Sequence, residues 1–231
     1  MFLKLLRLAV LIVVTGENVI GLSAVASPTE AMKFCQIVPD IIDVEPKVEA
    51  TVIFPSGVRM LMGAELTPTQ VKDQPVNISF AGLDSHSLYT LTFDDPDVPN
   101  RADQRKAEFL HWLVVNIPAG GQFLDTTKGD TYTEYVGSGP WLGSAFHRYT
   151  LLIFKQANRL TLNRTRVSNH SKEGRIGFKV REFAKQYSLG NPVAGNFFHA
   201  QFDSSVPNIT KQLSGKWRDK GIYKNIVCVN G

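Results

Sequence analysis

Two short apolar runs constrain the fold of this chain more than any other feature. Residues 109–117 are nearly all apolar or aromatic, and residues 149–154 form a second run of the same kind. Runs of this length and composition are typical of strands buried on both faces of a sheet. Further strands are predicted at residues 88–93, at residues 76–80, where apolar and polar side chains alternate, and as a pair within residues 53–62 around a Pro-Ser-Gly turn.

Helical signals are fewer. Thr67 and Gln70 form a capping box around Pro68, which predicts one or two helical turns that end at Pro75. The spacing of apolar residues predicts a longer helix at 180–187, with Gly190 in the position of a C-cap glycine.

A second C-terminal helix is predicted around residues 206–213, capped by Ser205 and ended by Gly215. Residues 27–50, which contain three prolines, are predicted to be extended and to wrap the surface. Strands in the first two thirds and helices in the last third predict a mainly β fold, a β-sandwich or barrel-like sheet with short helices attached.

The N-terminus has the pattern of a secretory signal peptide. Lys4 and Arg7 flank the apolar residues 8–14, and Ala24-Val25-Ala26 is a typical cleavage site. The alternatives are an uncleaved membrane anchor and a mitochondrial leader, and Glu17 with the scarcity of arginine disfavours the leader. We therefore expect a signal peptide at 1–26, a secreted protein, and one domain at 27–231 with N- and C-terminal extensions.

Cysteine and asparagine patterns agree with secretion. The two cysteines, Cys35 and Cys228, can pair in an oxidising compartment, the alternative being two unrelated buried thiols. The sequons at Asn163, Asn169 and Asn208 are candidate glycosylation sites. A fourth, at Asn77, lies in a predicted strand and is a weaker candidate.

Charge and motifs exclude several classes of function. The formal net charge of +4 is too small and too mixed to indicate a nucleic-acid partner. No segment after the N-terminus is apolar enough to cross a bilayer, so we expect no stable membrane insertion. No histidine or cysteine pair has zinc-ligand spacing, and no nucleophile motif occurs. We expect a non-enzymatic protein without metal or cofactor.

Four polar elements are candidates for a binding site. The loop at residues 94–99 (DDPDVP) directly follows a strand, and its two prolines stiffen it, although a solvated turn would have the same composition. By strand alternation His111 shares a face with Phe109, Leu113 and Val115, and a lone histidine in that position is more often a core residue.

Residues 136–140 (VGSGP) can form a backbone nest for an anion, or an ordinary loop. His147-Arg148 precedes the second apolar run, and Arg148 can bind an anion or brace a carboxylate. Together these elements match one ligand type. Imidazoles and a glycine nest can donate to a phosphate, and a fixed carboxylate can accept from an ammonium group or orient an imidazole.

The chain resembles the phosphatidylethanolamine-binding protein family from about residue 38 to residue 215. The resemblance is carried by a series of motifs in the same order, and the predicted signal peptide is most similar to the secreted invertebrate branch. The motifs lie at residues 66–72 (LTPTQVK), 82–85 (GLDS), 95–99 (DPDVP), 111–116 (HWLVVN), 135–140 (YVGSGP), 147–149 (HRY) and 192–196 (PVAGN).

The resemblance implies an antiparallel β-sandwich with short helices, an anion pocket near one edge, and a cis peptide in the aspartate–proline loop. Carried over by position, the ligand-binding residues are Asp95, Pro96, Pro99, Phe109, His111, Val136, Gly137, Gly139, Pro140 and His147. Three positions depart from the family pattern: Ala145 replaces a glycine, Lys106 a pocket tyrosine, and Thr210 an aromatic residue of the C-terminal helix.

The leading hypothesis is a non-catalytic, modulatory binding protein for phospholipid head groups or other small anions, which we expect to be a monomer. Alternatives are an inhibitor of a protease or kinase, acting on a protease or signalling partner, and a secreted carrier of odorants or other hydrophobic ligands. A carrier would need a deeper apolar cavity than a head-group pocket provides.

Overall fold

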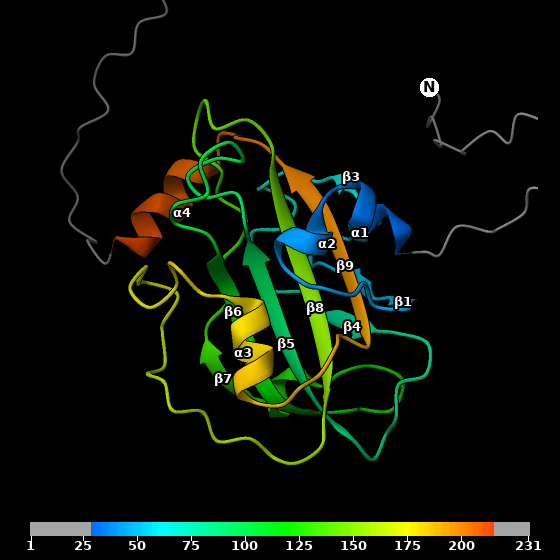
Figure 1. The fold of residues 1–231 in the computed structure, drawn as a ribbon. Helices are drawn as coiled ribbons and strands as arrows, with labels where there is room; N and C mark the ends of the chain where they lie inside the picture. The colour runs from blue at the N-terminus through cyan, green and yellow to red at the C-terminus, as the bar shows by residue number, and fades with distance from the viewer. Residues whose placement is uncertain (1–28, 215–231) are drawn as a thin grey trace, which may run out of the picture.

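The computed structural model describes residues 29–214 (Figure 1). Four long antiparallel strands form its centre, in the spatial order β9-β8-β5-β6. Two of them, β6 and β8, contain the two apolar runs. Their bounds are β5 (Leu88–Asp95), β6 (Phe109–Pro118), β8 (His147–Gln156) and β9 (Ala194–Ala200).

Shorter strands extend this sheet at both edges. The strand β7 (Asp130–Thr133) pairs antiparallel with β6, whereas β1 (Val48–Glu49) and β3 (Ala64–Glu65) both pair parallel with β9. A separate small sheet consists of β2 (Thr51–Ile53) and β4 (Asn77–Ser79). The prediction of a mainly antiparallel β fold is confirmed, and the parallel pairs make the seven-stranded sheet mixed.

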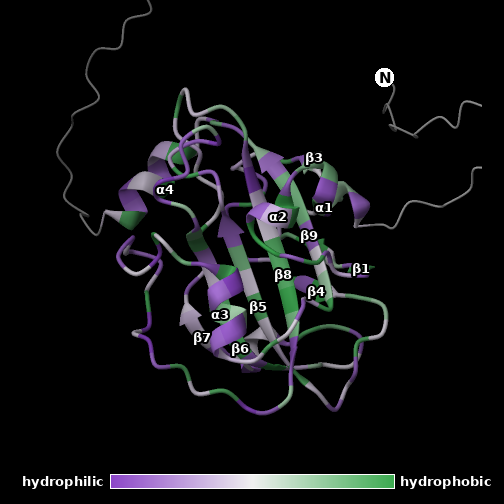
Figure 2. Cartoon of the chain, viewed as in Figure 1, coloured by the Kyte–Doolittle hydropathy of each residue, from purple (hydrophilic) through white to green (hydrophobic). Residues whose placement is uncertain are grey.

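The short helices are α1 (Glu30–Phe34), α2 (Ile37–Asp40), α3 (Val180–Gln186) and α4 (Val206–Leu213), with one 3-10 turn at Thr126–Lys128. Figure 2 shows apolar residues along β8 and mixed polar and apolar faces on α3 and α4. Among the described residues, no helix has the length and apolar character needed to cross a bilayer.

Two clusters of buried side chains lie on the two faces of the large sheet. The first core cluster joins it to the small sheet, because it contains Val52 and Ile78 together with Phe93 and Trp112. The second core cluster joins it to the helices and includes Met32, Ile37, Leu113, Phe154 and Val180. The sheet is therefore buried on both faces, as its apolar runs predict.

Several local predictions need correction. Residues 29–50 are not simply extended, because α1 and α2 form there. The capping box forms, with Thr67 N–H donating to Gln70 Oε1 at 2.9 Å, but the segment remains a turn. Asp203 accepts from the backbone N–H of Thr69, which ties this turn to a distant part of the chain.

The end of α3 and the start of α4 differ from the prediction. After α3 the first left-handed residue is Ser188 (φ 53°), and Gly190 follows at φ 69°. The Ser205 hydroxyl donates to Asp203 rather than capping α4. The predicted signal peptide, Cys228 and Gly215 lie outside the described residues.

Candidate functional site

The aspartate loop, residues 94–99, begins with the last two residues of β5, whose carboxylates lie on opposite faces of the sheet. Successive strand residues point to opposite faces, so Asp94 and Asp95 face apart. Asp94 is fully buried, neither carboxylate oxygen has a hydrogen-bond partner among the described residues, and burial raises its pKa well above the usual range. Asp95 instead accepts from His147 Nδ1 at 2.7 Å. Only Asp95 therefore contributes to a site with the histidines.

His147, at the start of β8, is held as a candidate hydrogen-bond donor. Burial lowers its pKa, but the hydrogen bond to Asp95 and the charges of Asp95 and Asp97 outweigh that effect, so the net shift is upward. The Pro99 carbonyl also favours the protonated ring, yet the buried Nε2 atom forms no hydrogen bond within the described residues. A protonated His147 thus has one N–H, on Nε2, that makes no close hydrogen bond among the described residues, and the Pro99 carbonyl is the acceptor that favours it.

His111 lies on a face of β6 that strand alternation does not predict. Phe93 of β5 pairs with Trp112, and Asp94 pairs with Leu110, so a bulge at His111 interrupts the register. The His111 ring contacts Phe93 and Tyr149, both members of the first core cluster, whereas Leu113 and Val115 belong to the second. Only the predicted neighbour Phe109 remains beside it, with ring centroids 4.9 Å apart.

The protonation of His111 differs from that of His147. Its Nδ1 lies 2.9 Å from the Val136 carbonyl, which can only accept, so Nδ1 carries the proton. Burial lowers the pKa of His111 to about 4. The ring is therefore neutral at pH 7 and its Nε2 is an acceptor, which corrects the expectation that both imidazoles donate to an anion.

Arg175 supports the bulge and is absent from the predicted site. This fully buried guanidinium donates to the carbonyl oxygens of Leu110 and His111 on β6 and of Glu134 across the site. Among the described residues its hydrogen-bond partners are all backbone carbonyls, and burial lowers its pKa to about 10. Its role could not be inferred from sequence, since Arg175 lies in a polar segment without a motif.

Tyr149 is a second residue that the sequence motif does not mark as part of the site. Its ring packs edge-on against His111, with centroids 5.2 Å apart, and near-parallel to His147 at 6.4 Å. Its hydroxyl accepts from the Gly139 N–H at 3.2 Å. Tyr149 therefore contacts both imidazoles and the loop at residues 136–140, here called the glycine loop.

The glycine loop is shaped largely by protein contacts. A side chain at Gly137 would approach the backbone of Lys72 to 2.8 Å, and one at Gly139 would meet Ile209 of α4 at 3.3 Å. Glycine at these two positions therefore leaves room for the neighbouring segments. Ser138 lies between them with a buried hydroxyl that has no partner among the described residues.

Arg148 braces a carboxylate rather than facing an anion site. It is fully buried, and its Nε and NH2 groups donate to the two oxygens of Asp97 at 2.9 and 2.7 Å. Its NH1 group donates to Asp40 and to the carbonyls of Cys35 and Gln36. The arginine thus fastens the α1–α2 segment to the aspartate loop.

The remaining predicted residues surround this centre. Pro96 and Pro140 are buried and Phe109 is half-buried. The cis peptide lies at Val98–Pro99, and the Pro99 carbonyl accepts from Trp141 Nε1 at 2.8 Å.

Of the three departures, Lys106 is exposed and Ala145 adopts a left-handed conformation at φ 63°. Thr210 is exposed and donates to the Val206 carbonyl of its own helix.

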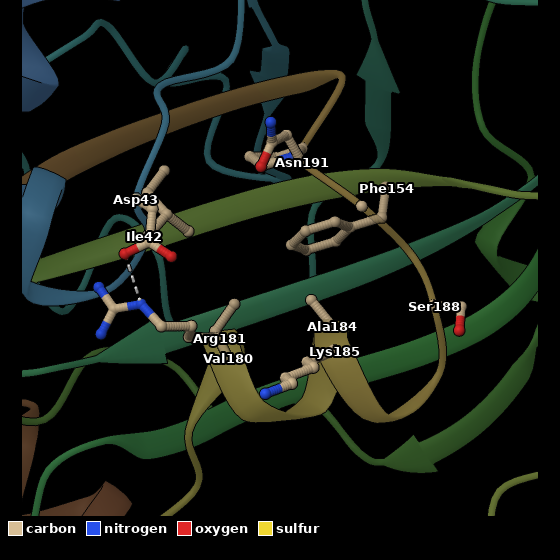
Figure 3. Close-up of a pocket in the computed structure, with 11 residues that line it drawn as sticks. Ile42, Asp43, Phe154, Val180, Arg181, Ala184, Lys185, Ser188 and Asn191 are labelled. Carbon is tan, nitrogen blue, oxygen red and sulfur yellow. Dashed lines mark ion pairs between the residues drawn. The ribbon is translucent and has the colours of Figure 1, made fainter.

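A separate hollow of about 430 Å³ lies on the opposite face of the sheet (Figure 3). Val180 and Ala184 of α3 face Phe154 there, and Arg181 pairs with Asp43 at its edge. Phe154 and Val180 are 1% and 0% exposed, so the apolar floor is almost closed to a ligand. This hollow does not supply the deep cavity that a hydrophobic carrier needs.

Comparison with known proteins identifies the family. A family model described as phosphatidylethanolamine-binding protein matches residues 56–198. The chain belongs to the phosphatidylethanolamine-binding protein family. A Drosophila melanogaster relative named putative odorant-binding protein A5 is 34% identical over 184 residues, which cover 80% of this chain and 85% of the relative.

Solved structures of the phosphatidylethanolamine-binding protein fold agree. The carboxypeptidase Y inhibitor, in complex with its cognate proteinase, is 26% identical with a TM-score of 0.64 and covers 75% of this chain and 94% of its own. The solution structure of CG7054 is 42% identical with a TM-score of 0.63, covering 78% and 98%. A Plasmodium vivax member, at 21% identity and a TM-score of 0.62 over 77% and 100%, shares the fold.

Proposed function

We propose that this chain is a non-catalytic binding protein for a phosphate monoester of the phospholipid head-group type. The observation that carries the proposal is the buried Asp95–His147 pair, which leaves His147 Nε2 without a partner among the described residues. An imidazolium oriented by a carboxylate is a strong donor to a phosphate oxygen. Family membership and the predicted ligand positions support the same interpretation.

The opposite roles of the two histidines restrict the ligand further. His147 offers a donor, whereas neutral His111 offers an acceptor. A phosphate monoester of ethanolamine carries phosphate oxygens for His147 and an N–H or P–O–H donor for His111. The Nε2 atom of His147 is covered in this structure, so binding requires the surrounding loops to move.

Calorimetric titration with O-phosphorylethanolamine tests the proposal. His147→Ala should weaken binding by about 10- to 100-fold, the equivalent of losing one charge-assisted hydrogen bond of about 1.5–3 kcal/mol. The matched control is His170→Ala, because His170 is exposed and lies outside the site. Near-UV circular dichroism checks that each variant is folded. Equal affinity of the wild type and a folded His147→Ala protein would remove the histidine from the site.

Protease inhibition is the second candidate function, favoured by the likeness to the carboxypeptidase Y inhibitor structure. Inhibition of a serine carboxypeptidase by the purified chain would support it, and the His147→Ala variant shows whether the two activities share a site.

For the secreted location, the support is the predicted signal peptide at 1–26, and N-terminal sequencing of protein from culture medium tests that cleavage. Mass spectrometry of the same unreduced material tests the Cys35–Cys228 bridge and glycans at Asn163, Asn169 and Asn208.

A further inference from the structure

The loop that leads into β8 carries three large apolar side chains in contact with water. Within residues 141–146, here called the apex loop, Leu142 is 70% exposed, Trp141 53% and Phe146 40%. Other exposed apolar residues are distributed over the molecule, among them Leu61 and Val76. An exposed apolar group of this kind next to a binding site indicates an interaction surface.

The apex loop is held in a defined shape. The backbone N–H and the hydroxyl of Ser144 both donate to the Trp141 carbonyl, at 3.0 and 2.8 Å, and Gly143 between them has a φ of 88°. This turn places Leu142 at the tip. The loop projects from the end of the large sheet beside α4 (Figure 1). Its apolar side chains are therefore presented outward rather than packed on the protein.

Trp141 joins the apex loop to the aspartate loop. Its indole N–H donates to the Pro99 carbonyl at 2.8 Å, while more than half of the residue remains exposed. An indole with a satisfied N–H and an exposed apolar body is typical of the level of lipid head groups.

Exposed cations follow directly after Pro99. Arg101, Arg105 and Lys106 lie within six residues, here called the basic loop. Within residues 29–214 the ion-pair partner of Asp103 is Arg105, whereas Arg101 donates to the neutral acceptors Cys35 O and Gln36 Oε1. Lys106 has no ion-pair partner in the part of the chain that the structure describes. The surface beside the apex loop is therefore positively charged.

We propose that the apex loop and the basic loop together dock on the surface of an anionic phospholipid membrane. Leu142 and Phe146 enter the boundary between head groups and acyl chains, Trp141 lies at head-group level, and the basic loop faces lipid phosphates. The inference rests on the proposed function in one respect: Phe146 precedes His147, so a docked membrane brings its head groups close to the segment that holds His147. Docking of this kind is peripheral and involves no spanning segment.

Vesicle co-sedimentation of the purified full chain tests the inference. The vesicles contain equal parts of phosphatidylcholine and phosphatidylserine, with pure phosphatidylcholine as the neutral comparison. We expect binding to the anionic vesicles and at least about tenfold weaker partitioning for the double variant Leu142→Ser with Phe146→Ser, because each residue loses apolar burial. The matched control is Leu61→Ser with Val76→Ser, which removes two apolar residues elsewhere that are 55% and 65% exposed, and it should bind like the wild type.

Two outcomes overturn the inference: no binding of the wild type to anionic vesicles, or the same loss in both double variants. A third is an apex variant that binds vesicles normally but no longer inhibits a serine carboxypeptidase, because the loop would then contact protein. Titration with soluble O-phosphorylethanolamine separates the two proposals. Normal affinity without vesicle binding refutes only the membrane surface, whereas apex-dependent vesicle binding without affinity for the soluble ligand refutes only the head-group site.

Discussion

Replacing Asp95 by asparagine tests the central pair of the site. Asp95 Oδ2 and His147 Nδ1 are 2.7 Å apart, and both side chains are at most 4% exposed. Asparagine preserves the shape and an acceptor oxygen but removes the negative charge. Since burial alone lowers the pKa of His147, we expect that pKa to fall in the variant. A lower pKa leaves a smaller fraction of the rings protonated on both nitrogens, and a neutral ring with its proton on Nδ1 presents Nε2 to the phosphate as an acceptor.

The magnitude follows from one charge-assisted hydrogen bond of about 1.5–3 kcal/mol, which corresponds to roughly 10- to 100-fold weaker binding of O-phosphorylethanolamine at pH 7. Calorimetry measures the affinity, and an NMR titration of the imidazole C–H signals without ligand measures the pKa of His147 directly. An unchanged or higher pKa in Asp95→Asn, or unchanged affinity at pH 7, would refute the reasoning.

The same pair predicts the sign of a pH effect on stability. The pKa of His147 is raised in the folded protein, so the pair's contribution to stability is fully present below the unfolded pKa of about 6.5. It is lost as the pH rises through the folded pKa. The difference in unfolding free energy between wild type and Asp95→Asn should therefore shrink with rising pH across that window, and a difference that grows would contradict the assignment.

Two further substitutions test the surroundings of the site. Arg148→Met leaves Asp97 buried without its partner and should lower the unfolding free energy measured in urea by about 3–5 kcal/mol. The control Arg159→Met removes an exposed ion pair and should lower it by less than about 1 kcal/mol. Similar losses in the two variants would contradict a structural role for Arg148. Ala145→Gly removes the strain of a left-handed alanine, about 1–2 kcal/mol, but the more flexible glycine stabilises the unfolded chain by about 0.4–1 kcal/mol. We therefore expect a small gain in thermal stability. A loss would show that the alanine at φ 63° is unstrained.

Local sequence patterns predict an element correctly where its structure depends on that segment alone. The runs at 109–117 and 149–154 became β6 and β8 because apolar composition over that length suits a strand covered on both faces. The loop at 94–99, whose prolines predict a stiff turn, begins at the end of β5 and contains the cis peptide Val98–Pro99. Family motifs predict which residues lie together in the site. In the structure Tyr149 contacts both histidines and the glycine loop.

Predictions failed where a contact between distant segments decides the outcome. The sequence leaves the role of Arg148 open between an anion and a carboxylate, and the choice is made by Asp97 and Asp40, which lie 51 and 108 residues away in the chain. The bulge at His111 is stabilised by Arg175, 64 residues later. The segment after Thr67 stays a turn although its capping box forms, and its Thr69 N–H donates to Asp203, 134 residues later. None of these partners is visible in a local window of sequence.

The two histidines show why residue type alone could not define the chemistry of the site. Both were interpreted as donors to an anion, because an imidazole can donate from either nitrogen. The partner of Nδ1 separates them: a carbonyl at His111, with burial dominating the pKa, and a carboxylate at His147, with charge dominating it. One ring is thereby left as an acceptor and the other as a donor. A site with one of each selects a ligand that carries both complementary groups, which a simple anion such as sulfate does not.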